Sequence, residues 1–182
     1  MLRTTIDLDA IAHNTRRLRE QTSAELMCVV KADAYNHGVE RCVPVMEAGG
    51  ADAFGVATFA EARRVRELTT KPVLAWLWDP QEELPAGVDV GVPSFTHLQS
   101  LIDAPTAPTA YLKVDTGMHR SGIDEVRWQE AFELALDAQR KGKLTVAGLM
   151  THLSCADDPA DPYTDQQAAA FRRAIAQARQ VG

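Results

Sequence analysis

The sequence lacks paired cysteines and an excess of positive charge. Its cysteines number three, at positions 28, 42 and 155, and none belongs to a C-x-x-C pair. Such spacing is typical of reduced thiols in a cytoplasmic protein and not of a disulfide framework. The formal net charge of −6 argues against nucleic acid or an anionic membrane as a partner.

Long hydrophobic runs and glycine-rich phosphate loops are also missing. No apolar run approaches the roughly 20 residues that a membrane span requires. Asp7 and Asp9 lie where a secretory signal would carry its apolar core, so we expect a cytoplasmic protein. No G-x-G-x-x-G or Walker loop follows a strand-like run, which disfavours a nucleotide-binding sheet.

What the sequence does contain is a regular alternation of strand-like and helix-like segments. Apolar runs rich in β-branched residues predict strands, and helical spacing or caps follow each of them. The expected strands are 26–30, 53–57, 73–78, 88–92, 110–114 and 144–150, after a short lead strand over 2–6. The expected helices run from Asp7 or Asp9 to Gln21, over 39–48, over 59–68, from Ser94 or Thr96 to Ile102, from Asp124 to Lys141, and onward from a capping box at Thr164-x-x-Gln167.

This alternation predicts an α/β fold in which crossover helices join parallel strands. The segment lengths allow either an open doubly wound sheet or part of a (β/α)8 TIM-type barrel. Lys31, Arg120 and His152 each fall at or just after the end of an expected strand. Active residues of barrels lie at those ends, so the pattern favours the barrel. Because a complete barrel needs about 250 residues, we expect an incomplete one with about six of its eight β/α units.

The segment around Lys31 carries the first candidate for chemistry. The apolar run Leu26–Val30 predicts a buried strand that ends in this lysine. Burial lowers the pKa of a lysine, and its neutral amine can then attack a carbonyl group, as Schiff-base chemistry with pyridoxal phosphate requires. A solvated lysine at a strand end is the alternative, and spacing alone leaves it open.

The loop over 115–122 is the second candidate. It follows an expected strand and places Arg120 between two glycines. Arginine keeps its charge, so it suits a phenolate or a carboxylate, although a solvated loop arginine has the same pattern. Lys113 lies within the strand, where an inward-facing lysine is costly unless it is neutralised or paired. His152 and Cys155 offer only two ligands, too few for a zinc site, and we expect no metal.

Three stretches in this order, Val29–Gly38, Lys113–Gly122 and Met150–Ala156, resemble motifs of the bacterial alanine racemases, which are fold-type III pyridoxal-phosphate enzymes. The resemblance extends over essentially the whole chain from Thr5. It implies a barrel with two further strands and a C-terminal β-domain, both absent here. It also implies pyridoxal 5′-phosphate as the cofactor, a homodimer with a shared site, and interconversion of L- and D-alanine, which supplies D-alanine for peptidoglycan. The expected domains are a lead strand over 1–8 and a partial cofactor-binding barrel over 9–182.

The resemblance also implies roles for individual residues. Lys31 would hold the cofactor and act as one of two bases, and Tyr35 would bind the cofactor phosphate. Arg120 would contact the ring hydroxyl of the cofactor and the carboxylate of the substrate. His152 would lie beside the cofactor ring, although a hydrogen-bonded structural histidine remains the alternative, and Lys113 matches a lysine that is often carbamylated. The second base, a tyrosine of the partner subunit's C-terminal domain, has no match in this chain.

The chain departs from the family pattern at Asn36 and His119, where glycine is usual. Asparagine tolerates a left-handed backbone nearly as well as glycine, whereas histidine with a positive φ is uncommon.

Without the second base, we expect the 182-residue chain alone to lack racemase activity. Two alternatives remain open. One is a single-domain carrier protein for pyridoxal phosphate. Against this alternative, the sequences of Tyr35–Gly38 and of the 115–122 loop resemble those of the racemases. The other is a non-catalytic fragment that does not fold stably because its barrel edges are unpaired.

Overall fold

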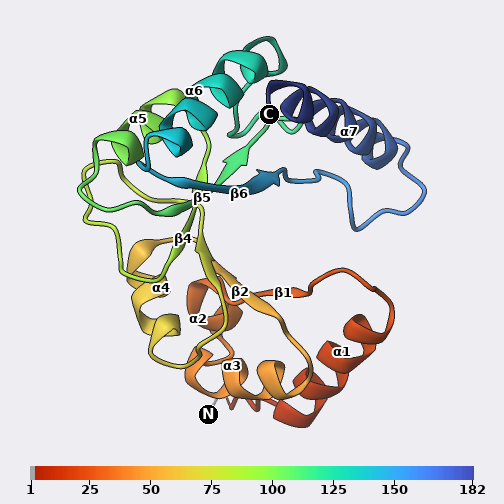
Figure 1. Cartoon of the computed structure of the whole chain (residues 1–182). Coiled ribbons are helices and arrows are strands. Elements are labelled where there is room, and N and C mark those ends of the chain that lie inside the picture. Colours follow the sequence, from red (N-terminus) through yellow and green to blue (C-terminus); the bar gives the residue numbers. More distant parts are fainter. Residues whose placement is uncertain (1–2) are drawn as a thin grey trace. The chain divides into compact units, whose positions relative to one another are not determined.

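A computed structural model describes residues 3–182 of the protein (Figure 1). The chain divides into two compact units. The first extends to Trp78 and includes Glu82–Asp89, and the second comprises Asp79–Gln81 and Val90–Gly182. No helix within residues 3–182 is long and apolar enough to cross a membrane.

The first unit alternates short parallel strands with helices, as the sequence predicts. Strand β1 pairs with β2 and β2 pairs with β3, all in parallel. All residues of β2 and β3 are buried. In chain order the elements are α1 (Leu8–Glu20), β1 (Met27–Val29), α2 (Lys31–Asn36), α3 (Val39–Ala48), β2 (Ala53–Val56), α4 (Phe59–Arg66) and β3 (Val73–Ala75).

The second unit repeats this arrangement. Strand β5 pairs in parallel with β4 and with β6. Helix α7 packs against α6 (Figure 1). In chain order the elements are β4 (Asp89–Val92), α5 (Phe95–Asp103), β5 (Thr109–Lys113), the 3-10 helix η1 (Glu125–Arg127), α6 (Trp128–Arg140), β6 (Thr145–Met150) and α7 (Tyr163–Val181).

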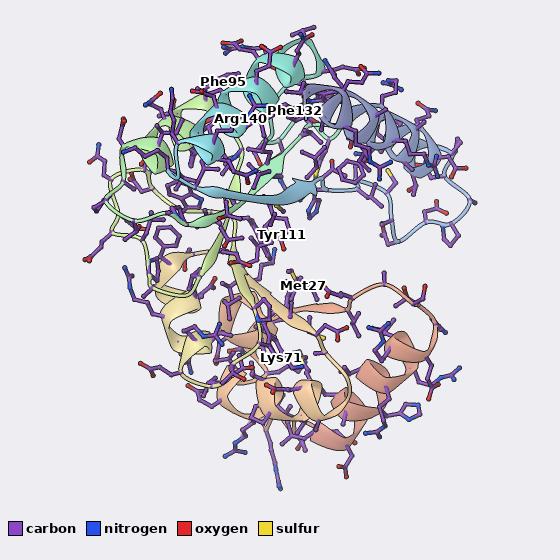
Figure 2. All side chains as sticks on the ribbon, viewed as in Figure 1. Met27, Lys71, Phe95, Tyr111, Phe132 and Arg140 are labelled. Atoms are coloured by element: carbon purple, nitrogen blue, oxygen red, sulfur yellow. The ribbon has the colours of Figure 1, made fainter. Side chains whose placement is uncertain are left out.

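Each unit has its own apolar core. In the first unit the rings of Phe59 and Trp78 stack with centroids 5.4 Å apart. In the second unit Phe132, which α6 contributes (Figure 2), is 4% exposed, and Trp128 is 1% exposed. The indole nitrogen of Trp128 donates to the carbonyl of Ile123 at 2.8 Å, which satisfies its polar edge within the core. Full burial of such side chains contributes about 1.5–3 kcal/mol each, so these clusters hold the helices against the strands.

Side-chain caps set where several helices begin. Asp7 accepts the N–H of Ala10 at 3.0 Å at the start of α1, and Ser94 caps α5. Both caps were predicted from the sequence.

Three sequence-based expectations about elements are wrong. The expected lead strand is absent over residues 3–6, which belong to no strand. Residues 1–2 of that expected strand lie outside the described part of the chain. The helix expected from Asp124 to Lys141 is split, because the 3-10 turn η1 precedes α6. The capping box at Thr164 does not form: α7 begins at Tyr163 after Pro162, and the Thr164 hydroxyl donates to the carbonyl of Cys155.

Candidate active site

The predicted site residues form two groups, one in each unit. Lys31 and Tyr35 belong to the first unit, whereas Lys113, Arg120 and His152 belong to the second. Every one of them lies at, or shortly after, the carboxyl end of a parallel strand. Barrel enzymes carry their active residues at such ends.

Lys31 follows β1 as the sequence predicts. Val30, the residue between them, is 1% exposed, and its N–H donates to the carbonyl of Gly55 on β2 at 2.8 Å. The Lys31 side chain is half-buried, and its Nζ lies 5.7 Å from the centroid of the Tyr35 ring. Lys31 is therefore only partly buried, where the sequence suggested a buried amine. Tyr35 is 55% exposed, so its hydroxyl is equally accessible.

The backbone after Lys31 forms a left-handed turn. Residues Ala32–Tyr35 have φ values between 51° and 56° and ψ values between 44° and 50°. Asn36 continues with a φ of 65°. A left-handed helical conformation costs an L-residue other than glycine roughly 1–2 kcal/mol, so four in succession require support from the surrounding structure.

That support comes from α3 and α4. The N–H of Ala32 donates to Glu61 Oε1 at 2.7 Å, across 29 residues of sequence. The carboxylate of Asp33 accepts the N–H of Val39 at 3.0 Å and lies 3.1 Å from the Arg64 guanidinium. Contacts with α3 and α4 thus hold the turn that joins Lys31 to Tyr35.

Glu61 is a site residue that the sequence analysis missed. Besides Ala32, its carboxylate accepts the N–H groups of Ala57 at 2.8 Å and Thr58 at 3.0 Å. Burial acts to raise the pKa of the Glu61 carboxyl, but the amide donors, Ala32 first, outweigh it and hold that pKa below its ordinary value. The capping-box spacing Thr58-x-x-Glu61 is visible in the sequence and would have identified this residue as a helix cap.

The loop that carries Arg120 is closed by its own backbone. Val114 and Ile123 form a parallel bridge at its base. Gly122 has a φ of 137°, and a Cβ there would lie 2.7 Å from the amide nitrogen of Asp115, so only glycine fits. The Arg120 side chain is exposed on this loop.

Asp115 stabilises the loop from within. Its Oδ1 accepts the N–H of Gly117 at 2.9 Å and of His119 at 3.1 Å, while Oδ2 lies 3.2 Å from His119 Nδ1. Burial acts to raise the pKa of the Asp115 carboxyl, but these amides and His119 lower it overall. His119 adopts a φ of 54°, a left-handed conformation that is uncommon for histidine.

We expect His119→Gly to be more stable than His119→Ala by about 1 kcal/mol, because alanine keeps the left-handed strain and glycine relieves it. Both variants lose the ring's contact with Asp115, which cancels in the comparison. Urea unfolding of the two variants measures the difference. Equal midpoints would show that the positive φ of His119 carries no strain.

Lys113 is buried within the second unit. The residue is 5% exposed, and its Nζ donates to the hydroxyl of Ser121. Burial lowers the pKa of Lys113, the positive charge of Arg120 lowers it further, and Asp115 acts in the opposite direction.

His152 lies two residues beyond β6. Its backbone carbonyl accepts the Nε2–H of Gln167 at 3.0 Å. Next to it, the hydroxyls of Thr151 and Thr116 lie 2.8 Å apart, and Thr151 also donates to the carbonyl of Val114 at 3.0 Å. The segments that carry His152 and Arg120 are thus linked directly. Within residues 3–182 no group of three or more His, Cys, Asp or Glu side chains could hold a metal ion.

Comparison with known proteins identifies relatives along the whole chain. A family described as "Alanine racemase, N-terminal domain" matches residues 6–182. The alanine racemase of Corynebacterium efficiens is 52% identical over 100% of this chain and 51% of its own length. That of Mycolicibacterium smegmatis is 42% identical over 90% of this chain and 45% of its own. The chain thus spans about half the length of the curated relatives it matches.

Solved structures of alanine racemases are also similar to this chain. The crystal structure of alanine racemase from Corynebacterium glutamicum superposes with a TM-score of 0.91 at 48% identity, over 98% of this chain and 52% of that one. Alanine racemase from Bartonella henselae, with covalently bound pyridoxal phosphate, gives a TM-score of 0.77 at 25% identity, over 94% of this chain and 52% of that one. The predicted fold class, a partial α/β barrel of the TIM type, is confirmed.

Proposed function

The chain belongs to the alanine racemase N-terminal domain family over residues 6–182, and from this we propose that it provides the cofactor-binding part of a pyridoxal-phosphate-dependent enzyme that interconverts L- and D-alanine. The observation that carries the proposal is Lys31. This half-buried residue follows β1 directly after Val30 and begins a left-handed turn that Val39, Glu61 and Arg64 hold in place. A scaffold of this kind is expected where a nucleophile must be held in one geometry.

The described residues carry side-chain groups that suit pyridoxal phosphate. Lys31 offers an amine for the aldehyde, and the accessible hydroxyl of Tyr35 can donate to the phosphate. Arg120 offers a permanent positive charge for the ring oxygen and for the substrate carboxylate. His152 would lie beside the ring. When bound, pyridoxal phosphate supplies an electron sink for a carbanion at the substrate Cα.

Lys31 would also move the proton. The unprotonated amine of Lys31 could take the Cα proton from one face of the substrate. Racemisation also needs a base on the opposite face, and we propose that a residue beyond these 182 positions, in a homodimeric full-length protein, supplies it. The chain alone is therefore expected to bind the cofactor without turning over alanine.

A carbamylated Lys113 would keep Arg120 oriented. Burial lowers the pKa of Lys113, so its neutral amine is more accessible for reaction with carbon dioxide. In that reaction an N–C bond forms and the nitrogen loses a proton, which leaves a carbamate anion beside the Arg120 cation. A crystal structure of the full-length protein should show density beyond Lys113 Nζ. A bare amine there would refute carbamylation.

The test of the proposed function is an assay of D-alanine formation from L-alanine by the full-length protein with pyridoxal phosphate, next to the 182-residue chain alone. We expect turnover by the full-length protein and none by the chain. A full-length protein that binds the cofactor but does not racemise alanine would favour the carrier function. Robust turnover by the chain alone would refute the need for a second base outside it.

A further inference from the structure

Gln167 on α7 is a fully buried polar residue, with a side chain that uses every hydrogen-bonding position it has. Its Nε2 donates to Thr116 Oγ1 at 3.1 Å and to the carbonyl of His152 at 3.0 Å. Its Oε1 accepts the N–H of Ser154 at 2.8 Å and the Ser154 hydroxyl at 3.0 Å. Its exposed fraction is 0%. An amide offers two donors and two lone pairs, so all four are satisfied, and the orientation of the amide is fixed.

These four bonds join the two loops that carry the site residues of the second unit. Thr116 belongs to the loop that leads to Arg120, and Ser154 flanks His152. One helical turn earlier on α7, the hydroxyl of Tyr163 donates to the carbonyl of Gly117 at 2.8 Å. A Cβ at Gly117 would lie only 2.5 Å from that hydroxyl, so the two groups are in close contact.

Residues four apart on a helix share one face. The face of α7 that carries Tyr163 and Gln167 therefore contacts both loops, and we name these two residues the α7 clasp. Gln167 is fully buried and so does not contact a substrate directly. An apolar side chain of the same shape would fill the space, but it would remove all four of these hydrogen bonds.

We propose that the α7 clasp, and Gln167 above all, is a positioning device that holds the Arg120 loop in register with the His152 segment. The proposal rests on the proposed function, because it assumes that Arg120 binds the substrate carboxylate. Loss of the clasp loosens the loop that presents the arginine, so it weakens substrate binding more than it slows the chemical step.

The experiment compares Gln167→Met with Gln166→Met in the full-length protein with its cofactor. The two variants carry the same substitution at neighbouring positions of α7, but Gln166 is exposed whereas Gln167 is buried. Two quantities are measured: the exchange rate of the Ser154 amide proton, which needs no activity, and KM and kcat for alanine. We expect Gln167→Met to speed Ser154 exchange at least tenfold and to raise KM about tenfold, with a smaller change in kcat. Gln166→Met should change neither.

If Gln167→Met does not fold, Tyr163→Phe serves instead, because it removes a single O–H from the clasp and keeps the ring. That variant should raise KM about threefold at an unchanged kcat. A Gln167→Met protein with faster Ser154 exchange but unchanged KM would reduce Gln167 to a structural role and overturn the proposal. Unchanged Ser154 exchange would overturn the clasp itself, whereas an inactive wild-type protein would refute the proposed function instead.

Discussion

Lys31→Ala is expected to lower the proposed alanine racemase activity of the full-length protein by about 10²–10⁴-fold from the loss of the base alone. The substitution also removes the amine that would hold the cofactor covalently. Lys31 is half-buried beside the exposed ring of Tyr35, and the other lysine of the first unit's described residues, Lys71, lies between α4 and β3. The loss should therefore appear in kcat and in cofactor binding together.

Absorbance of the bound cofactor and the initial rate of D-alanine formation measure the two losses separately. Lys31→Arg keeps the positive charge but cannot lose its proton, so it should fail in the same way. Lys143→Ala, in an exposed loop after α6, is the matched control and should keep full activity. A Lys31→Ala protein with activity within tenfold of the wild type would contradict both roles.

Glu61→Ala is expected to lower the free energy of unfolding by about 2 kcal/mol, because charge-assisted hydrogen bonds to three backbone amides are lost with the cap of α4. One of those amides, at Ala32, begins the left-handed turn after Lys31, so the turn loses a main support. Urea unfolding at neutral pH measures the effect. The exposed Glu67, at the end of the same helix, provides the control Glu67→Ala, which should stay within about 0.5 kcal/mol of the wild type.

The effect of Glu61→Ala should depend on pH with a definite sign. The pKa of Glu61 is lower in the folded chain than in the unfolded chain, so the native state favours the ionised carboxylate. The stability that it contributes is fully present above the unfolded pKa, near 4.3 for glutamate, and is lost as the pH falls through the folded value. The difference between wild type and Glu61→Ala should therefore shrink below about pH 4. A difference that grows on acidification would contradict the assignment.

The alternation of elements and the position of Lys31 could be predicted because they depend on local patterns. Apolar runs place β1 and β2 close to where they occur, and the caps at Asp7 and Ser94 act on residues three positions away. The strands are shorter than their apolar runs: β3 ends at Ala75, although the run continues to Trp78. Trp78 instead stacks on Phe59, a contact that periodicity does not reveal.

The capping box that does not form and the left-handed turn after Lys31 share one physical cause, which is tertiary hydrogen bonding that overrides a local pattern. Thr164-x-x-Gln167 has the spacing of a capping box, but Gln167 bonds to Thr116 and Ser154 instead of to its own helix. Similarly, Ala32–Tyr35 consists of residues that ordinarily take right-handed conformations. The bond from Ala32 to Glu61 spans 29 residues, so a local reading of the sequence has no means of detecting the reversed turn.

The turn after Lys31 also has a consequence for chirality. Its backbone angles, near 50° in both φ and ψ, are the mirror image of an ordinary α-helix. A D-amino acid adopts those angles without the steric conflict that an L-residue meets there. At Ala32, whose side chain is exposed, the polypeptide therefore holds an L-alanine in the conformation native to D-alanine. In a chain proposed to interconvert these two enantiomers, D-alanine at position 32 would be less strained than the L-alanine that is there.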